Sequence, residues 1–202
     1  MGQHKDSTAS AVRNKINAAS KNSIFFVTDF LDLKNPETVT RELSRLASQG
    51  VVIRIAKGIY LKPTVTQFGI VYPSSREIAE TIARRDGARI FPTGETLLNE
   101  FGLSEQVPMN SIYITDGTPR QIVIGKHTIT LRRGAPRNFA YKSKGAPYIV
   151  SILKALGKEQ VTEEVIGVIR MIIGREKNPS FLLDDLKLAP IWIQKIVLPL
   201  IP

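Results

Sequence analysis

The segment from residue 35 to residue 62 carries the clearest pattern of hydrophobic and polar positions in the chain. Apolar residues recur there at i, i+4 and i+7, at Val39, Leu43 and Leu46. This spacing predicts an amphipathic helix with one apolar stripe. Asn35 is a suitable N-cap, and Gly50 suits the C′ position just after the helix. The helix is therefore expected to begin and end between these two residues.

A different face of the same helix is polar and basic, and the sequence after it alternates as two short strands. The polar face is formed by Thr38, Arg41, Arg45 and Ser48. The strands are expected at residues 51–55 and 59–62, joined by a turn at residues 56–58. A basic helix followed by a two-stranded hairpin, or wing, is typical of the DNA-reading part of a winged helix-turn-helix. The alternative is an ordinary surface helix followed by a hairpin.

The residues before this helix complete a small N-terminal domain. A first helix is expected over about residues 7–19, and a brief second helix at residues 29–33 is capped by Thr28. The apolar run at residues 24–27 is either a strand or a segment that packs under the helices. Three short helices and a hairpin predict a winged helix-turn-helix DNA-binding domain over residues 1–63.

The remaining residues, 64–202, predict a second domain that mixes helices and strands. Strand patterns at residues 111–115 and 121–124 are expected to form a hairpin. From residue 147 onward the pattern is helical up to a tail interrupted by prolines. The expected fold class is therefore α+β, with an N-terminal winged helix-turn-helix followed by a mixed α/β domain that has a helical C-terminal end.

The charge of the chain indicates an anionic partner. Its 202 residues carry a net charge of +10, whereas a hydrophobic content of 43% is ordinary for a globular protein. The basic excess lies mostly before residue 146, because residues 146–202 contain 7 basic and 6 acidic side chains. Nucleic acid is the first candidate partner and a membrane surface the second.

Several classes of protein are disfavoured by what the sequence contains. There is no cysteine, which excludes disulfides, thiolate metal sites and a cysteine nucleophile. The N-terminus has no apolar signal-peptide region, and no apolar run reaches the roughly 18 residues of a membrane span. A cytoplasmic protein without a membrane partner is therefore predicted.

Catalytic chemistry finds little support in the sequence. The two histidines, His4 and His127, are interpreted as solvated residues, and the pair Asp184 and Asp185 as a solvated helix face. No zinc-protease motif, nucleophile elbow or phosphate-binding glycine loop is present. We therefore expect a protein that is not an enzyme and that needs no cofactor or metal.

Candidate DNA contacts come from the chemistry of the predicted helix and wing. Arg41 and Arg45 provide forked donors that match guanine or phosphate, and the neighbouring threonines are small enough for a close approach. Thr28 can donate to a phosphate, and the basic residues of the wing can meet phosphates or enter the minor groove. The predicted DNA-binding residues are Thr28, Thr38, Thr40, Arg41, Arg45, Arg54, Lys57 and Lys62.

Two further features have more than one interpretation. Tyr60, in the wing, is either a core residue or a donor to phosphate. A second basic cluster is either a solvated loop, an extra DNA-contacting patch, or a docking face for an acidic partner. This cluster consists of Arg132, Arg133, Arg137, Lys142 and Lys144.

Three sequence segments together resemble a known family. The segment LSRLASQGVVIRIAKGIYLKP is similar to the winged helix of the AbiEi-like antitoxins of type IV abortive-infection systems, in which a Gly-Ile/Val-Tyr wing strand is usual; here it is Gly58-Ile59-Tyr60. The segments PTGETLLNEFGLSEQVPMNSIYITDG and IVIGKHTITLRRGAPRN resemble the second domain of the same family. The resemblance covers about residues 7–145.

The resemblance implies a function in phage defence by a toxin–antitoxin system. Such antitoxins are encoded beside a nucleotidyltransferase-like toxin, repress their own operon through the winged helix, and counter the toxin through the C-terminal domain without a stable toxin complex. Operators of such helices are often inverted repeats, so a dimer is expected on double-stranded DNA. One alternative is a winged-helix regulator whose second domain senses a ligand or dimerises, with no toxin. Another is an interaction protein whose basic face meets an acidic protein.

Overall fold

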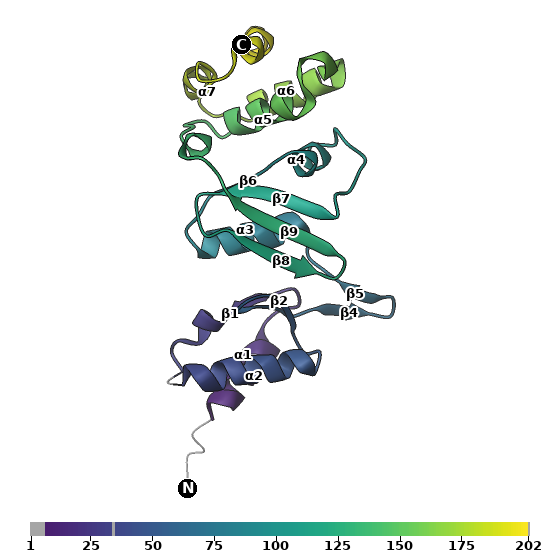
Figure 1. The fold of residues 1–202 in the computed structure, drawn as a ribbon, viewed down its shortest axis with the longest axis vertical. Coiled ribbons are helices and arrows are strands. Elements are labelled where there is room, and N and C mark those ends of the chain that lie inside the picture. The colour runs from purple at the N-terminus through teal and green to yellow at the C-terminus, as the bar shows by residue number, and fades with distance from the viewer. Residues whose placement is uncertain (1–6, 34, 202) are drawn as a thin grey trace. The chain divides into compact units, whose positions relative to one another are not determined.

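The computed structural model describes residues 7–33 and 35–201 (Figure 1). Over these residues the chain is a mixed α+β protein with several small sheets. It divides into two compact units, Met1–Thr81 with Ile122–Lys126, and Ile82–Gln121 with His127–Pro202. The division falls within helix α3 (Ser75–Arg85), and the sequence pattern breaks earlier, near residue 63.

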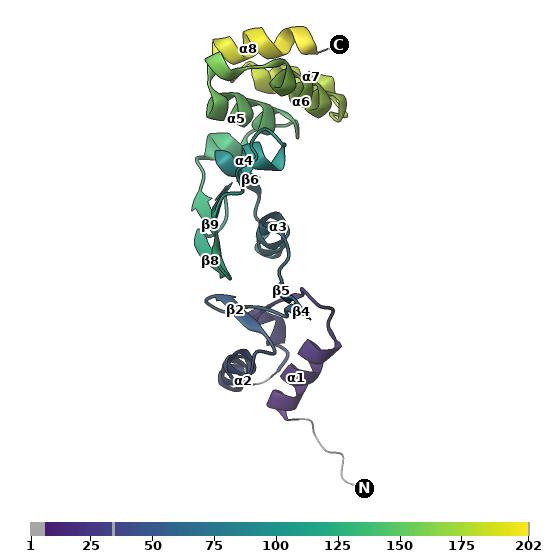
Figure 2. The ribbon, with the colours of Figure 1, turned by 90° about the vertical axis from the view of Figure 1, so that its right-hand side faces the viewer.

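The first unit alternates short helices and short strands. Its elements before α3 are α1 (Thr8–Ala18), β1 (Ile24–Phe26), the 3-10 helix η1 (Val27–Phe30), α2 (Pro36–Ser48), β2 (Ile53–Ala56), β3 (Ile59–Leu61), β4 (Thr64–Thr66) and β5 (Gly69–Val71). The strand β3 is central in a three-stranded sheet and pairs antiparallel with both β1 and β2. Helices α1 and α2 pack together on one side of this sheet (Figure 1, Figure 2).

Helix α2 has the start, the end and the apolar stripe that its sequence predicts. The Oδ1 of Asn35 accepts a hydrogen bond from the backbone N–H of Thr38 at 3.0 Å. Gly50, just beyond the helix, has a φ of +72°, which glycine adopts without the steric cost of a side chain. The predicted stripe is buried to 2% exposure or less, at Val39, Leu43 and Leu46. These side chains hold α2 against the core of the first unit.

Two local features of the first unit differ from expectation. The segment after β1 is a 3-10 helix that begins at Val27, so Thr28 lies within it and does not cap it. The N-cap residue is Phe26, whose backbone N–H donates to the Asp29 carboxylate at 2.8 Å. Residues 64–71, where only an exit from the domain is expected, form the β4–β5 hairpin. The apolar side chains of this hairpin are exposed, with Phe68 at 91%. A half-buried strand is recognised in a sequence by alternating buried and exposed positions. This hairpin has no such alternation, so the sequence pattern does not identify it.

The second unit joins a four-stranded sheet to a helical end. Its elements after α3 are β6 (Ile90–Pro92), α4 (Glu95–Glu100), β7 (Asn110–Thr115), β8 (Arg120–Ile124), β9 (His127–Arg133), η2 (Pro136–Phe139), α5 (Ala146–Leu156), η3 (Lys158–Gln160), α6 (Glu163–Gly174), α7 (Pro179–Leu186), α8 (Ile191–Val197) and η4 (Leu198–Leu200). Helix α3 and strand β8 contribute residues to both units.

The strand order of this sheet is β6-β7-β9-β8, which overturns one expectation. Because β7 pairs antiparallel with β6 and parallel with β9, β7 and β8 are not neighbours, and the hairpin predicted from residues 111–115 and 121–124 is wrong. The tight turn lies instead between β8 and β9, where Gly125 has a φ of +58°. Consecutive strands pair in most proteins, but the longer connection at residues 116–119 lets β8 pass to the far side of β9.

The helices from α4 to α8 share one buried core. Helix α4 contacts both β7 and α5, so it links the sheet to the helical end (Figure 2). Core residues with no exposed surface include Ile149, Ile152, Leu153, Ile169, Leu182, Leu186, Ile193 and Val197. From the sequence alone, the residues of α8 are expected only as part of a tail interrupted by prolines. In the structure Pro190 is the N-cap of this helix, and Pro199 lies in the η4 turn that follows it.

Candidate nucleic-acid interface

The polar face of helix α2 lies open at the surface of the first unit. A shallow depression along it is lined by Pro36, Glu37, Thr40, Arg41 and Ser44. Thr38, predicted on this face, is half-buried beside the Asn35 cap. The Thr40 hydroxyl donates to the carbonyl of Pro36 at 3.0 Å, so its oxygen stays available as an acceptor. Of the predicted polar face, Arg41, Arg45 and Ser48 are exposed and Thr38 is not.

Arg41 is the cation that α2 presents without an internal partner. Its side chain is exposed, and within the described part of the chain it makes no ion pair and no hydrogen bond. Its five N–H donors are therefore free to bind a carbonyl, a base edge or a phosphate. The structure places it beside Thr40, as the sequence predicts.

Arg45, by contrast, is bound within the first unit. Its Nε and Nη2 donate to the two oxygens of Glu42 at 2.8 and 2.7 Å, and Arg13 of α1 lies 3.3 Å from the same carboxylate. Glu42 is 6% exposed. The hydrogen bonds from Arg45 lower the pKa of Glu42, burial raises it, and Arg13 lowers it further. The arrangement is a buried carboxylate clamped between two arginines, and it fixes α2 against α1.

The β2–β3 hairpin carries two of the predicted cations. Arg54 on β2 and Lys57 at the turn are both exposed. Gly58 follows Lys57 with a φ of +71°, and its carbonyl accepts a hydrogen bond from the backbone N–H of Val27 at 3.1 Å. Tyr60 is 2% exposed and belongs to the core of the first unit, so the core interpretation of this residue is the correct one.

Lys62 has a partner that the sequence does not reveal. Its ammonium donates to the carbonyls of Ile16, Asn17 and Ala19 at 2.9, 2.9 and 2.7 Å. These carbonyls end helix α1, where a cation is stabilised by the helix dipole. The predicted DNA contact by Lys62 is therefore replaced by a structural role, in which it ties β3 to α1. Thr28, on η1, is exposed.

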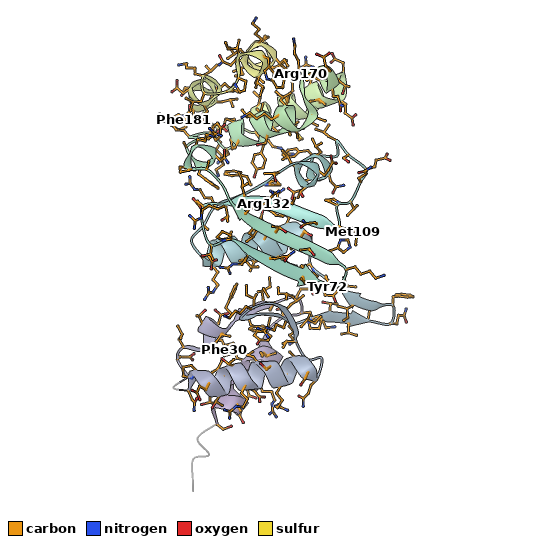
Figure 3. The ribbon with its side chains drawn as sticks, viewed as in Figure 1. Phe30, Tyr72, Met109, Arg132, Arg170 and Phe181 are labelled. Carbon is orange, nitrogen blue, oxygen red and sulfur yellow. The ribbon has the colours of Figure 1, made fainter. Side chains whose placement is uncertain are left out.

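All five residues of the second basic cluster are exposed on the second unit, but they belong to different elements. Arg132, which is labelled in Figure 3, and Arg133 end β9. Arg137 lies in η2. Lys142 and Lys144 line a groove of about 390 Å³, which they share with Arg89 and the aromatic side chains Phe91, Tyr141 and Tyr148. We call this site the basic–aromatic groove. Arg89 is absent from the predicted set because it reaches the groove from a position 53 residues before Lys142 in sequence.

One acidic residue near this groove corrects an expectation. Asp184 is exposed, as predicted, but Asp185 is 3% exposed, so the solvated interpretation is wrong for it. The Asp185 carboxylate accepts hydrogen bonds from the backbone N–H groups of Lys142 at 3.1 Å and Ser143 at 2.7 Å. Its neighbours lie 42 and 43 residues away in sequence, so the local pattern carries no sign of them.

The described residues give little support to a metal site, a histidine site or a membrane-spanning helix. Across residues 7–33 and 35–201, no group of three His, Asp or Glu side chains is placed to hold a metal ion. His127 is exposed at the start of β9, and His4 lies outside the described residues. No helix in this part of the chain is both long and apolar enough to cross a bilayer.

The fold and the interface define a basic α+β protein whose first unit presents a helix face with an unpaired arginine. Residues 11–181 match a protein family described as a family of unknown function, DUF6088. The chain belongs to this family. No curated protein matches the sequence.

Proposed function

We propose that this protein binds double-stranded DNA through its first unit and represses its own operon. The proposal is supported by the order α1, β1, η1, α2 and the β2–β3 hairpin, which is compatible with a winged helix-turn-helix in which α2 would be the recognition helix and the hairpin the wing. In such a domain the recognition helix enters the major groove and the wing approaches the backbone or the minor groove. The net charge of +10 suits a polyanionic partner.

The observation that carries this proposal is the free guanidinium of Arg41 on the open face of α2. An arginine in that position can donate two parallel hydrogen bonds to O6 and N7 of guanine. The small side chains of Thr40 and Ser44 let the duplex come close on the same face. Arg54 and Lys57 supply contacts to phosphates, which position the helix without reading sequence. Base reading is assigned to Arg41 rather than to Arg45, because Glu42 already holds Arg45.

Binding to DNA from just upstream of its own gene tests this function. We expect tight, salt-dependent binding to that duplex and much weaker binding to a scrambled duplex. Arg41→Ala should weaken specific binding by about 1–3 kcal/mol, since one bidentate base contact is lost. Arg170→Ala, an exposed arginine on α6 of the second unit, is the matched control and should bind as the parent does. Equal binding of the parent to both duplexes would contradict sequence-specific repression.

We further propose that the protein acts as the antitoxin of a type IV abortive-infection system. This part is supported by the sequence resemblance over about residues 7–145. It predicts that the full chain restores growth to cells that express the nucleotidyltransferase-like toxin encoded beside its gene. If the C-terminal domain counters the toxin, Arg41→Ala should protect as well as the parent although it no longer represses. Loss of protection in parent and variant alike would refute the antitoxin assignment.

A second candidate function is a winged-helix regulator whose second domain senses a ligand. The observation that favours it is the basic–aromatic groove of the second unit, which has the size of a small-ligand site. Operator binding measured with and without a ligand of that groove distinguishes the two candidates. Only a ligand sensor changes its affinity for DNA when the ligand binds.

A further inference from the structure

The basic–aromatic groove combines cationic side chains with aromatic rings. Its aromatic side is a cluster of neighbouring rings, in which Phe91 lies 5.7 Å from Phe139 and 5.7 Å from Tyr148 between ring centroids. Phe139 is buried, whereas Phe91, Tyr141 and Tyr148 are half-buried and line the groove. Each of these three residues therefore keeps some exposed surface beside the groove, where an aromatic ligand can pack.

The basic side of the groove consists of Arg89, Lys142 and Lys144. The two lysines are exposed, and within the described residues neither ammonium forms an ion pair or a hydrogen bond. Arg89 is held in place, because its Nε meets Asp116 at 2.8 Å and its Nη1 donates to the carbonyl of Phe139 at 2.6 Å. Its guanidinium also lies 5.2 Å from the centroid of the Phe139 ring. The groove thus presents a fixed guanidinium, which is ion-paired with Asp116, and two lysine ammonium groups beside aromatic surface.

Two carboxylates hold the backbone that carries the lysines. Asp185 binds the backbone N–H groups of Lys142 and Ser143, and Glu176 binds those of Lys144 and Gly145 at 2.9 and 3.0 Å. Both carboxylates position this segment through its backbone N–H groups, and each keeps its negative charge. The segment is shaped before any ligand arrives, which lowers the entropy cost of binding.

We propose that the basic–aromatic groove binds a nucleotide unit, with its base stacked on the half-buried rings and its phosphate held by Lys142 and Lys144. The same chemistry is offered by a free mononucleotide and by one residue of a single strand. A base paired within a duplex does not fit, because its faces are covered by its neighbours in the stack. The site lies wholly in the second unit and does not depend on duplex binding by α2.

The aromatic surface of the groove favours a nucleotide over an acidic peptide. An acidic peptide would use the cations alone, whereas a base can also stack on the aromatic surface. The Tyr141 hydroxyl makes no hydrogen bond within the described residues, and burial raises its pKa, as does the Asp185 charge, so it stays a neutral donor at pH 7. Such a donor can bind a base edge or a phosphate oxygen.

The test uses the full chain carrying Arg41→Ala and Lys57→Ala, so that α2 and its hairpin contribute little. Fluorescence anisotropy measures binding of a labelled 12-nucleotide oligo(dT), an abasic strand of equal length and charge, and a peptide of 12 glutamates. Lys142→Gln with Lys144→Gln should weaken oligo(dT) binding on the order of tenfold and reduce the salt slope by about 0.7 per lost phosphate contact. Lys154→Gln with Lys158→Gln removes the same charge at the other end of α5 and should change little.

Each outcome bears on the proposal. If a base stacks in the groove, oligo(dT) should bind more tightly than the abasic strand. The Tyr141→Phe variant keeps the aromatic ring, so it should still bind oligo(dT) more tightly than the abasic strand. Competition by adenosine monophosphate would identify a mononucleotide site, and its failure to compete would identify a strand site. Equal binding of oligo(dT), abasic strand and polyglutamate would overturn the proposal in favour of a general anion surface. So would equal losses in the two lysine double variants.

Discussion

Replacing Asp185 by alanine tests how the segment before α5 is held. The variant removes the acceptor of two backbone N–H groups, one of them on Ser143, which is 4% exposed. A buried donor left without a partner costs about 1–3 kcal/mol, and the partly buried N–H of Lys142, which water can reach, adds about 1 kcal/mol. Because the alanine variant no longer buries a carboxylate, it avoids the desolvation cost of that group, which offsets part of this loss. We therefore expect a decrease of about 2–3 kcal/mol in the free energy of unfolding.

The chain contains a natural probe and a natural control for this measurement. Trp192 is its only tryptophan and packs against the core of helices α4 to α8, so its fluorescence reports unfolding of the second unit. Asp184→Ala removes the neighbouring carboxylate, which is exposed and binds only the exposed Lys187 among the described residues. Its urea midpoint should match that of the parent. Equal midpoints for Asp185→Ala and Asp184→Ala would refute the assigned role of Asp185.

Three further predictions concern the first unit. Lys62→Met should lower the stability of the first unit by about 1–2 kcal/mol, because the carbonyls that end α1 lose their cation, and amide hydrogen exchange in α1 measures this loss. The same variant should leave the salt slope of DNA binding unchanged. Because the pKa of Glu42 is lowered in the folded state, the clamp contributes its full stability above the ordinary glutamate pKa and loses it as pH falls through the lowered value. Acid titration of the α2 amide signals should therefore show a step that Glu42→Gln removes, and an identical titration in both proteins would contradict this. Lys57→Ala should weaken binding to all duplexes alike and reduce the salt slope by about 0.9, whereas a loss confined to one sequence would mean that Lys57 reads bases.

The sequence predicts a structural element best when the residues that determine it lie close together in the chain. The stripe of Val39, Leu43 and Leu46, the Asn35 cap and the Gly50 stop all lie within 16 residues, and the structure confirms each of them. Periodicity and capping depend only on such neighbours, so the amino-acid sequence alone is enough to place α2.

The partners of charged side chains are beyond the reach of local patterns. Lys62 is bound 43 to 46 residues back in sequence, and Asp185 reaches 42 and 43 residues back, so only the folded chain brings these groups together. Arg45 is a different case, because Glu42, which holds it, lies only three residues earlier on the same helix. What local spacing does not reveal is that Glu42 is buried and also meets Arg13 of α1. The sequence thus predicts the candidate interface as a surface, while the choice between Arg41 and Arg45 requires the tertiary structure.

The placement of β9 between β7 and β8 has a consequence for how the chain reaches its native state. During synthesis β7 and β8 emerge before β9, and the four-residue connection between them is still within the range that allows consecutive strands to form a hairpin within microseconds. A β7–β8 hairpin is non-native here, because β7 pairs with β9 in the finished sheet. If this early pairing forms, it has to open before β9 can insert between the two strands, and we expect it to delay folding of the second unit. A substitution that strengthens the connection at residues 116–119 should therefore slow refolding while leaving the equilibrium stability nearly unchanged.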